Sequence, residues 1–197
     1  MADAWRGRYQ PQLETVRSGE REWVVLDVLH REALDDVLAE LALDLPAGQR
    51  DELNLAWHRL DPWPDTVSGL TRLKERYVVA PCSNGHIAQS VNLARYAGLP
   101  WDAILGAGIA RAYKPDPRVY RASVAALGLE PGEAMMVAAH NSDLVAAAAL
   151  GLMTAFVPRP REHGPGQTSD LRAEAAYDVV ATDLVDLANA LTAPIGP

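Results

Sequence analysis

Hydrophobic residues in the first sixty positions recur at the three- to four-residue spacing of amphipathic helices. One helix is predicted over residues 3–17, and Ser18 and Gly19 end it. A second is predicted over residues 23–43, because its apolar side chains form one broad face. A third is predicted over residues 49–60. No strand pattern occurs in this part of the chain, so it predicts a small all-helical subdomain over residues 1–62.

From residue 63 the pattern alternates between helix and strand. The expected helices are 67–75, 87–97, 117–127, 143–150 and 183–191, and the expected strands are 77–82, 103–107, 134–138, 153–157 and 177–180. Strands that alternate with helices of this length indicate βαβ units and a parallel sheet. Residues 63–193 therefore predict an α/β core, whose ligands would bind at the carboxyl ends of the strands. The long polar stretch 158–170 predicts a lid or a feature of the sheet edge.

Composition narrows the function classes. The chain has 197 residues and a formal net charge of 18 − 26 = −8, which disfavours nucleic acid and anionic membranes as partners. Its one cysteine, Cys82, cannot form an internal disulfide, which suits a reducing cytoplasm. No apolar run has the length of a membrane span, and the N-terminus has no apolar signal-peptide core. A cytoplasmic protein with a small-molecule ligand is the expectation.

Polar side chains follow three of the predicted strands. Ser83 and Asn84 stand where a strand turns into a helix, and there they could bind an anion or simply cap the helix. Lys114 lies in a loop stiffened by Pro115 and Pro117. A lysine held in this way can neutralise a substrate carboxylate or a catalytic aspartate, although a surface lysine in a capped turn has the same pattern.

The third group, His140 and Asp143, follows the strand predicted over residues 134–138. Asp143 could be a base, a metal ligand or an N-cap. His140 alone is weak evidence for a metal, because no histidine or cysteine partner occurs at ligand spacing. The chain has no Gly-x-Gly-x-x-Gly, Walker A or Gly-x-Ser-x-Gly pattern, which disfavours dinucleotide enzymes, P-loop NTPases and serine hydrolases.

In order and spacing these three segments resemble the motifs of the haloacid dehalogenase (HAD) superfamily, and most closely those of its type II L-2-haloacid dehalogenase branch. Residues 83–85 resemble the second motif, residues 113–117 with Tyr120 resemble the third, and residues 137–143 resemble the fourth. Residues 1–62 resemble the all-α cap of this branch. The resemblance implies a HAD-like Rossmannoid parallel sheet with an N-terminal helical cap.

One departure favours a dehalogenase over a phosphatase. HAD phosphatases usually carry a second acid four residues before the last aspartate of the fourth motif, and the two acids help to hold Mg²⁺. Here that position is Ala139, which offers no oxygen ligand to a hard cation. A dehalogenase expels halide and needs no metal for phosphoryl transfer, so the resemblance implies no metal and no cofactor.

The resemblance also implies a two-step reaction on a 2-haloacid. An aspartate attacks C2, expels halide and forms an ester, which water then hydrolyses. Arg6 and Asn84 match the residues that bind the departing halide, and Ser83 matches the hydroxyl that holds the substrate carboxylate. For Arg6 the alternative is an ordinary solvated arginine on a helix.

Three further residues complete the match. Lys114 matches the lysine that neutralises the site of the nucleophile, and Asp143 matches the acid that orients or activates the water. His140 stands where the family often has asparagine, which leaves its role open. It could keep a hydrogen-bonding role near substrate and halide, or titrate near neutral pH.

The nucleophile of the family has no counterpart in this sequence. In the superfamily it ends the first, central strand, in an Asp-x-x-Gly-Thr-like segment ahead of the cap. The nearest candidate, Asp27, follows a short apolar run, but no Gly-Thr follows it and the segment continues with helical spacing. We therefore expect an N-terminally truncated dehalogenase with little or no turnover, or a gap filled by repacking or by a partner. The alternatives are a HAD phosphatase and a non-catalytic HAD-like binding protein; a homodimer is compatible with all three.

Overall fold

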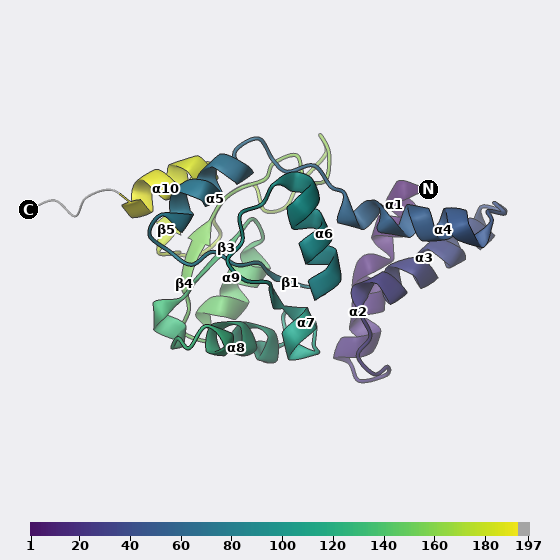
Figure 1. Ribbon diagram of the computed structural model, residues 1–197, viewed down its shortest axis with the longest axis horizontal. Coiled ribbons are helices and arrows are strands. Elements are labelled where there is room, and N and C mark those ends of the chain that lie inside the picture. The colour runs from purple at the N-terminus through teal and green to yellow at the C-terminus, as the bar shows by residue number, and fades with distance from the viewer. Residues whose placement is uncertain (193–197) are drawn as a thin grey trace, which may run out of the picture.

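The N-terminal third of the chain is helical in the computed structural model, which describes residues 1–192 (Figure 1). Its helices lie together at one end of the molecule and pack around a cluster that contains Trp5, Leu34 and Leu38. They are α1 (Ala2–Gly7), α2 (Tyr9–Arg17), α3 (Leu26–Glu40), α4 (Ala47–Asn54) and the 3₁₀ turn η1 (Leu55–His58). The predicted boundary at residue 62 falls in the segment between η1 and the next helix.

The helix expected over residues 3–17 is two helices, interrupted at Arg8. Proline explains the break. Pro11 has no N–H to donate to the carbonyl of Gly7, so the hydrogen-bond ladder stops there and Pro11 falls in the first turn of α2, where proline is tolerated. The bend lets Trp5 and Leu13 enter two different hydrophobic clusters, both of which include residues of α3.

The second helix is also shorter than expected, because it begins at Leu26 and not at Trp23. The β-branched Val24 and Val25 are extended, which suits their restricted side-chain rotamers. The carbonyl of Val24, free of any helix, accepts a hydrogen bond of 2.7 Å from the hydroxyl of Tyr113. This bond ties the helical lobe to the rest of the molecule.

The remainder of the described chain is an α/β lobe, as predicted. Its elements are α5 (Thr66–Lys74), β1 (Cys82–Ser83), α6 (Ile87–Ala97), β2 (Leu105–Gly106), α7 (Ala107–Ala110), α8 (Pro117–Ala126), η2 (Pro131–Glu133), β3 (Met135–Ala138), α9 (Asn141–Ala148), β4 (Met153–Phe156), β5 (Val179–Val180) and α10 (Leu184–Thr192). Every strand pair is parallel. Residue 193, the last of the predicted core, lies outside the described residues.

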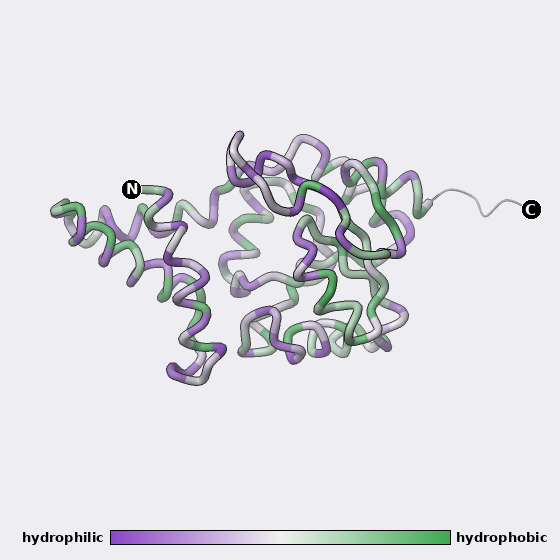
Figure 2. The backbone as a smooth tube through the Cα atoms, turned by 180° about the vertical axis from the view of Figure 1, so that it is seen from behind, coloured by the Kyte–Doolittle hydropathy of each residue, from purple (hydrophilic) through white to green (hydrophobic). Residues whose placement is uncertain are grey.

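The strands form two separate sheets, one of order β1-β2 and one of order β3-β4-β5. Within residues 1–192, β1 is paired only with β2 and β3 only with β4. Helices α5 and α10 pack on one face of the three-stranded sheet, and α8 and α9 pack on the other (Figure 1). Hydrophobic stretches of the backbone run through this interior (Figure 2).

The strand expected over residues 77–82 is the largest difference from the sequence prediction, since only Cys82–Ser83 is a strand. A strand needs a partner to bond its backbone. Val79 instead donates its N–H to the carboxylate of Asp102 at 2.9 Å, and its carbonyl accepts the N–H of Asp102 at 2.8 Å. The side chains of Tyr77 and Val78 are exposed.

None of the helices in residues 1–192 has the length and apolar character needed to cross a membrane.

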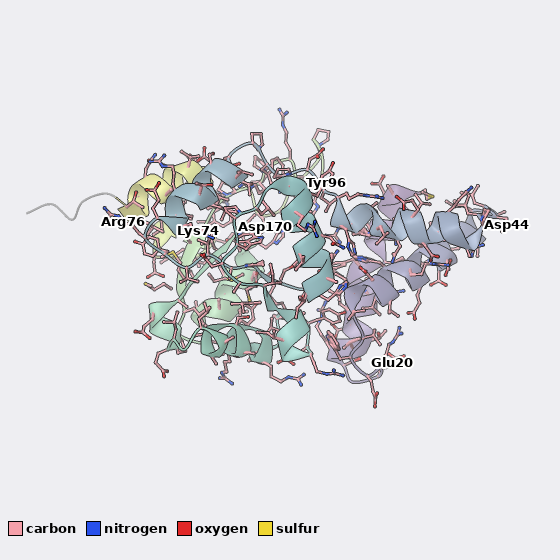
Figure 3. All side chains as sticks on the ribbon, viewed as in Figure 1. Glu20, Asp44, Lys74, Arg76, Tyr96 and Asp170 are labelled. Atoms are coloured by element: carbon pink, nitrogen blue, oxygen red, sulfur yellow. The ribbon has the colours of Figure 1, made fainter. Side chains whose placement is uncertain are left out.

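The two lobes meet along α6, where the hydroxyl of Tyr96 donates to Asp61 at 3.1 Å (Figure 3). Asp44 marks the far tip of the helical lobe in the same view.

A buried ion pair fixes the start of the polar loop 158–170. Arg159 donates both terminal nitrogens to the carboxylate of Asp65, at 2.9 and 2.8 Å, and both side chains are only 14% exposed. The backbone N–H of Leu184 donates to the same carboxylate at 2.8 Å. The loop is thereby tied to the beginnings of α5 and α10.

This ion pair should make the stability of the protein fall in acid. Burial alone would raise the pKa of Asp65, but hydrogen bonds from Arg159 and Leu184 outweigh it and lower the pKa below its ordinary value. A carboxyl with a lowered pKa stabilises the fold above its unfolded pKa of about 3.9, and this stability is lost as the pH falls through the folded value. We expect Asp65→Asn to cost about 3–5 kcal/mol at pH 7, and less at pH 3, which lies below the unfolded pKa. Urea unfolding at the two pH values measures the difference; an equal cost at both would contradict the assignment.

Candidate active site

The carboxyl end of β1 holds the first pair of predicted site residues. Ser83 is paired with Gly106 of β2, and its hydroxyl accepts the N–H of Gly85 at 3.0 Å. The serine therefore closes its own turn and does not cap the helix: α6 begins at Ile87 with His86 as its N-cap, which receives no side-chain cap hydrogen bond. Its hydroxyl still has a proton to donate to a ligand.

Asn84 connects three parts of the molecule. Its side-chain oxygen accepts the backbone N–H of Lys114 at 2.7 Å, and its side-chain amide donates to the hydroxyl of Tyr9 at 3.1 Å. Tyr9 belongs to α2, so this amide bridges the two lobes. The asparagine holds the loop before α8 in place as well as facing the helical lobe.

The polar centre of the site is a lysine–aspartate pair. Lys114 Nζ lies 2.5 Å from one carboxylate oxygen of Asp143, and the hydroxyl of Tyr120 donates to the other oxygen at 2.5 Å. The Lys114 and Asp143 side chains are only 16% and 11% exposed. Burial, followed by the hydrogen bond to Asp143, raises the pKa of Tyr120, so this hydroxyl stays protonated and remains a donor. Asp143 lies in the first turn of α9, where the helix dipole favours a negative charge.

Arg6 reaches this centre indirectly. Its guanidinium lies 4.6 Å above the ring of Tyr9, which is bonded to Asn84. Arg6 lines an open cleft of about 870 Å³ between the helical lobe and the polar loop, together with Trp57, Glu162 and others. The sequence reasoning did not identify Tyr9. The available signal was its position three residues after Arg6, on the same face of a helix.

His140 faces the polar loop. Its Nε2 lies 3.0 Å from a carboxylate oxygen of Glu162, and within residues 1–192 its side chain makes no hydrogen bond to Lys114 or Asp143, although its backbone carbonyl accepts the N–H of Asp143 at 3.2 Å. The hydrogen bond and the charge of Glu162 outweigh burial and raise the pKa of His140, while the same contact lowers the pKa of Glu162. Of the predicted residues, Asn84, Lys114 and Asp143 are joined by hydrogen bonds, and Ser83 directly precedes Asn84. Arg6 is linked to this group through Tyr9, and His140 through its backbone carbonyl.

Two other candidate nucleophiles are engaged elsewhere. Asp27 lies in the first turn of α3, as its helical spacing predicts, and both of its oxygens are 3.0 Å from His58 Nε2. The thiol of Cys82 lies 3.5 Å from the hydroxyl of Ser123, and burial raises its pKa, which disfavours the reactive thiolate.

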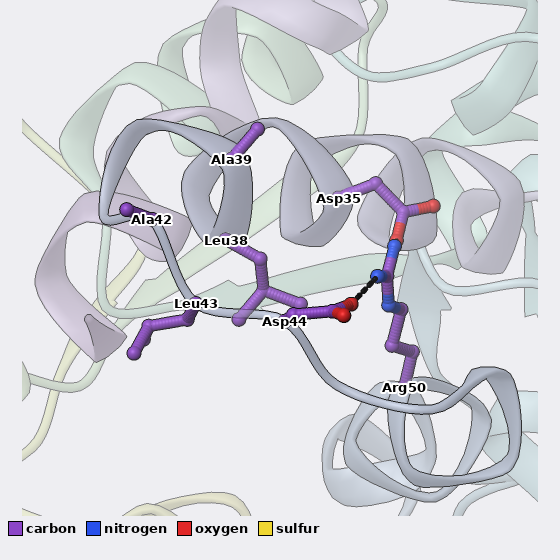
Figure 4. Close-up of a pocket in the computed structure, with 7 residues that line it drawn as sticks. All are labelled: Asp35, Leu38, Ala39, Ala42, Leu43, Asp44 and Arg50. Atoms are coloured by element: carbon purple, nitrogen blue, oxygen red, sulfur yellow. Dashed lines mark hydrogen bonds and ion pairs between the residues drawn. The ribbon is translucent and has the colours of Figure 1, made fainter.

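A second, smaller pocket of about 380 Å³ lies wholly within the helical lobe (Figure 4). Arg50 donates there to Asp44 and Asp35, at 3.3 and 3.1 Å. Arg50 is thus shared between two carboxylates, and Asp44 marks the far tip of the lobe (Figure 3). This pocket plays no part in the site.

Comparison with known proteins agrees with the geometry. The sequence profile of the haloacid dehalogenase-like hydrolases matches residues 3–151. The (S)-2-haloacid dehalogenase 4A of Burkholderia cepacia is 32% identical over 158 residues, which are 79% of this chain and 68% of that protein. The crystal structure of a defluorinating L-2-haloacid dehalogenase superposes with a TM-score of 0.95 at 53% identity, covering 96% of this chain and 79% of the other.

A more distant structure is informative about chemistry. The L-2-haloacid dehalogenase of Xanthobacter autotrophicus, with chloropropionic acid covalently bound, superposes with a TM-score of 0.81 at 25% identity, covering 97% of this chain and 85% of that one. The present chain therefore belongs to the haloacid dehalogenase-like hydrolases. Within them it falls in the L-2-haloacid dehalogenase branch, which confirms the resemblance found in the sequence.

Proposed function

We propose that this site serves the hydrolytic dehalogenation of (S)-2-haloacids. The observation that carries the proposal is the largely buried Lys114–Asp143 pair beside Asn84. Four residues before Asp143, Ala139 stands in place of a second acid. A lysine there offers positive charge to an anionic substrate without a metal. The names of the relatives, which are (S)-2- and L-2-haloacid dehalogenases, support the same reaction.

The proposed roles are those that the motif resemblance implies, and the positions of the side chains support them. The hydroxyl of Ser83 binds the substrate carboxylate at the end of β1. Asn84 and Arg6 face the departing halide, one on each side of Tyr9. Lys114 holds the anionic groups, and Asp143 orients the water. His140 lies at the rim and contacts substrate or halide only if it leaves Glu162.

The reaction requires a carboxylate that attacks C2 of the haloacid. A carbon–oxygen bond forms, the carbon–halogen bond breaks, and halide leaves with the bonding electrons. Water then attacks the resulting ester, regenerates the carboxylate and releases a 2-hydroxyacid and a proton. The covalently bound chloropropionic acid in the Xanthobacter enzyme is consistent with such an ester.

We further propose that residues 1–197 do not contain this carboxylate. Asp143 has both oxygens bonded, to Lys114 and Tyr120, and Asp27 is held by His58. The edges of β1 and β3 are not bonded to each other. A strand placed between them would bring an aspartate at its carboxyl end close to Lys114, since the ends of parallel strands meet at one edge of a sheet.

Chloride release from (S)-2-chloropropionate tests the function. We expect the 197-residue chain to bind this acid in calorimetry and to release little or no chloride, and we expect a longer chain that carries such a strand to release it. Lys114→Met should abolish binding of (S)-2-chloropropionate by the 197-residue chain and chloride release by the longer chain. Turnover by the 197-residue chain that is lost in Asp143→Asn but kept in Asp27→Asn would contradict the proposal that residues 1–197 lack the nucleophile. Mg²⁺-dependent hydrolysis of p-nitrophenyl phosphate would instead indicate a phosphatase.

A further inference from the structure

Three potential metal ligands meet where the polar loop folds back over the end of β3. His140 Nε2 lies 3.0 Å from Glu162, and the ring of His163 stacks parallel to that of His140, with centroids 6.4 Å apart and planes 14° apart. One ligand atom from each of the three residues can be chosen so that all lie within 4.8 Å of one another. Two imidazoles and one carboxylate thus lie close together, although His140 is more than twenty residues away from Glu162 and His163 in the sequence.

This combination of ligands selects a class of ion. Imidazole nitrogens suit Zn²⁺ and Co²⁺, whereas Mg²⁺ and Ca²⁺ require oxygen ligands. Two histidines and a glutamate form a known three-ligand set for zinc, with the fourth position left open. Bonds of about 2.1 Å in a tetrahedron place the ligand atoms about 3.4 Å apart, so separations of up to 4.8 Å have to shorten by up to about 1.4 Å. Glu162 and His163 stand on an exposed loop without helix or strand, which can make such a shift.

The other contacts of these three residues do not explain why all three lie together. The ion pair with Glu162 accounts for His140, but His163 has no side-chain hydrogen bond among residues 1–192. His163 is nevertheless held close, because its backbone N–H donates to Gln167 at 3.1 Å. Further along, Asp170 accepts two hydrogen bonds from Asn141, at 2.8 and 2.9 Å, so the loop is fixed next to His140 from its other end (Figure 3).

We propose that His140, Glu162 and His163 bind a divalent transition-metal ion such as Zn²⁺, and that the ion fastens the loop 158–170 to the end of β3. Glu162 and His163 also line the cleft that contains Arg6. The bound ion therefore forms part of the wall of this cleft, and its open coordination position is available to an anion there. Metal binding at this loop does not depend on the proposed dehalogenation.

Calorimetric titration with ZnCl₂ and CoCl₂ tests the site, with metal-free protein that carries no polyhistidine tag. We expect one ion per chain, a visible absorption band of bound Co²⁺, and no competition from Mg²⁺. His140→Asn, Glu162→Gln and His163→Ala should each weaken binding by more than about tenfold, because even second-shell changes at metal sites cost about 10–100-fold. His86→Asn and Glu174→Gln, a histidine and an exposed acid outside the cluster, serve as matched controls and should keep full affinity.

Limited proteolysis gives an independent measure of the fastening. Trypsin can cleave after Arg161 in the loop, and Zn²⁺ should slow this cleavage in the parent protein but not in His163→Ala under the same conditions. Binding that survives His163→Ala, the absence of stoichiometric binding, or equal protection of the two proteins would each overturn the proposal.

Discussion

Replacing Lys114 by methionine should lower the free energy of unfolding by about 3–5 kcal/mol, because it leaves the carboxylate of Asp143 buried without its positive partner. Methionine keeps most of the length of the side chain and removes the ammonium group, with its charge and its hydrogen-bond donors. Asp143 would keep a single donor, the hydroxyl of Tyr120. Urea unfolding followed by tryptophan fluorescence measures the change, since the chain has five tryptophans.

Two controls separate the buried pair from a general effect of charge. Lys74 also pairs with an aspartate, Asp102, at 2.7 Å, but their side chains are 39% and 31% exposed, so Lys74→Met should cost less than about 1 kcal/mol. The double variant Lys114→Met/Asp143→Asn should be more stable than the sum of its single changes predicts. A cost below about 1 kcal/mol for Lys114→Met would show that the pair is solvated and would weaken its assignment as the centre of the site.

Much of the fold could be predicted from the sequence because helices are specified locally. Apolar spacing identified the helical and α/β parts. Most differences lie at the ends of elements, but the helix expected over residues 3–17 is divided at Arg8 and the strand expected over residues 77–82 is reduced to Cys82–Ser83. The break at Arg8 was also available from the sequence, because Pro11 cannot continue a ladder from Gly7. The ends of the strands could not be predicted from the local sequence in this way. A strand extends only as far as a neighbour bonds it, and Val79 is bonded to Asp102 instead.

The residues of the site also divide into those that the local sequence predicts and those that it does not. Ser83, Asn84, Lys114 and Asp143 could be found because each follows a predicted strand, and the ends of parallel strands meet at one edge. For Tyr9 the one signal was its position three residues after Arg6, and Glu162 had none. Their contacts with Asn84 and His140 depend on how a separate lobe and a long loop fold back onto that edge. Nothing in the local sequence encodes this return. The role of His140 stayed open in the sequence analysis for the same reason.

The second large effect is expected at Gly106, the partner of Ser83 in the two-stranded sheet. Its φ of +102° lies in a region that side chains avoid, which costs a non-glycine residue about 1–3 kcal/mol. A Cβ atom at this position would also lie 2.4 Å from the carbonyl oxygen and 2.5 Å from the nitrogen of Ser83. Both are backbone atoms, so no side-chain rotation relieves the clash, which adds about 1–3 kcal/mol more. Gly106→Ala should therefore destabilise the protein by about 2–6 kcal/mol.

Two other glycines isolate the causes. Gly98 has a φ of +67° but open space where a Cβ atom would lie, so Gly98→Ala should show backbone strain alone, about 1–2 kcal/mol. Gly132 has neither feature, and Gly132→Ala should be close to neutral. Because the clash separates β1 from β2, Gly106→Ala should also weaken (S)-2-chloropropionate binding more than Gly98→Ala does, under conditions where both proteins are folded. If the two variants bind equally well, the position of Ser83 does not depend on this close approach, and the role proposed for its hydroxyl loses its structural basis.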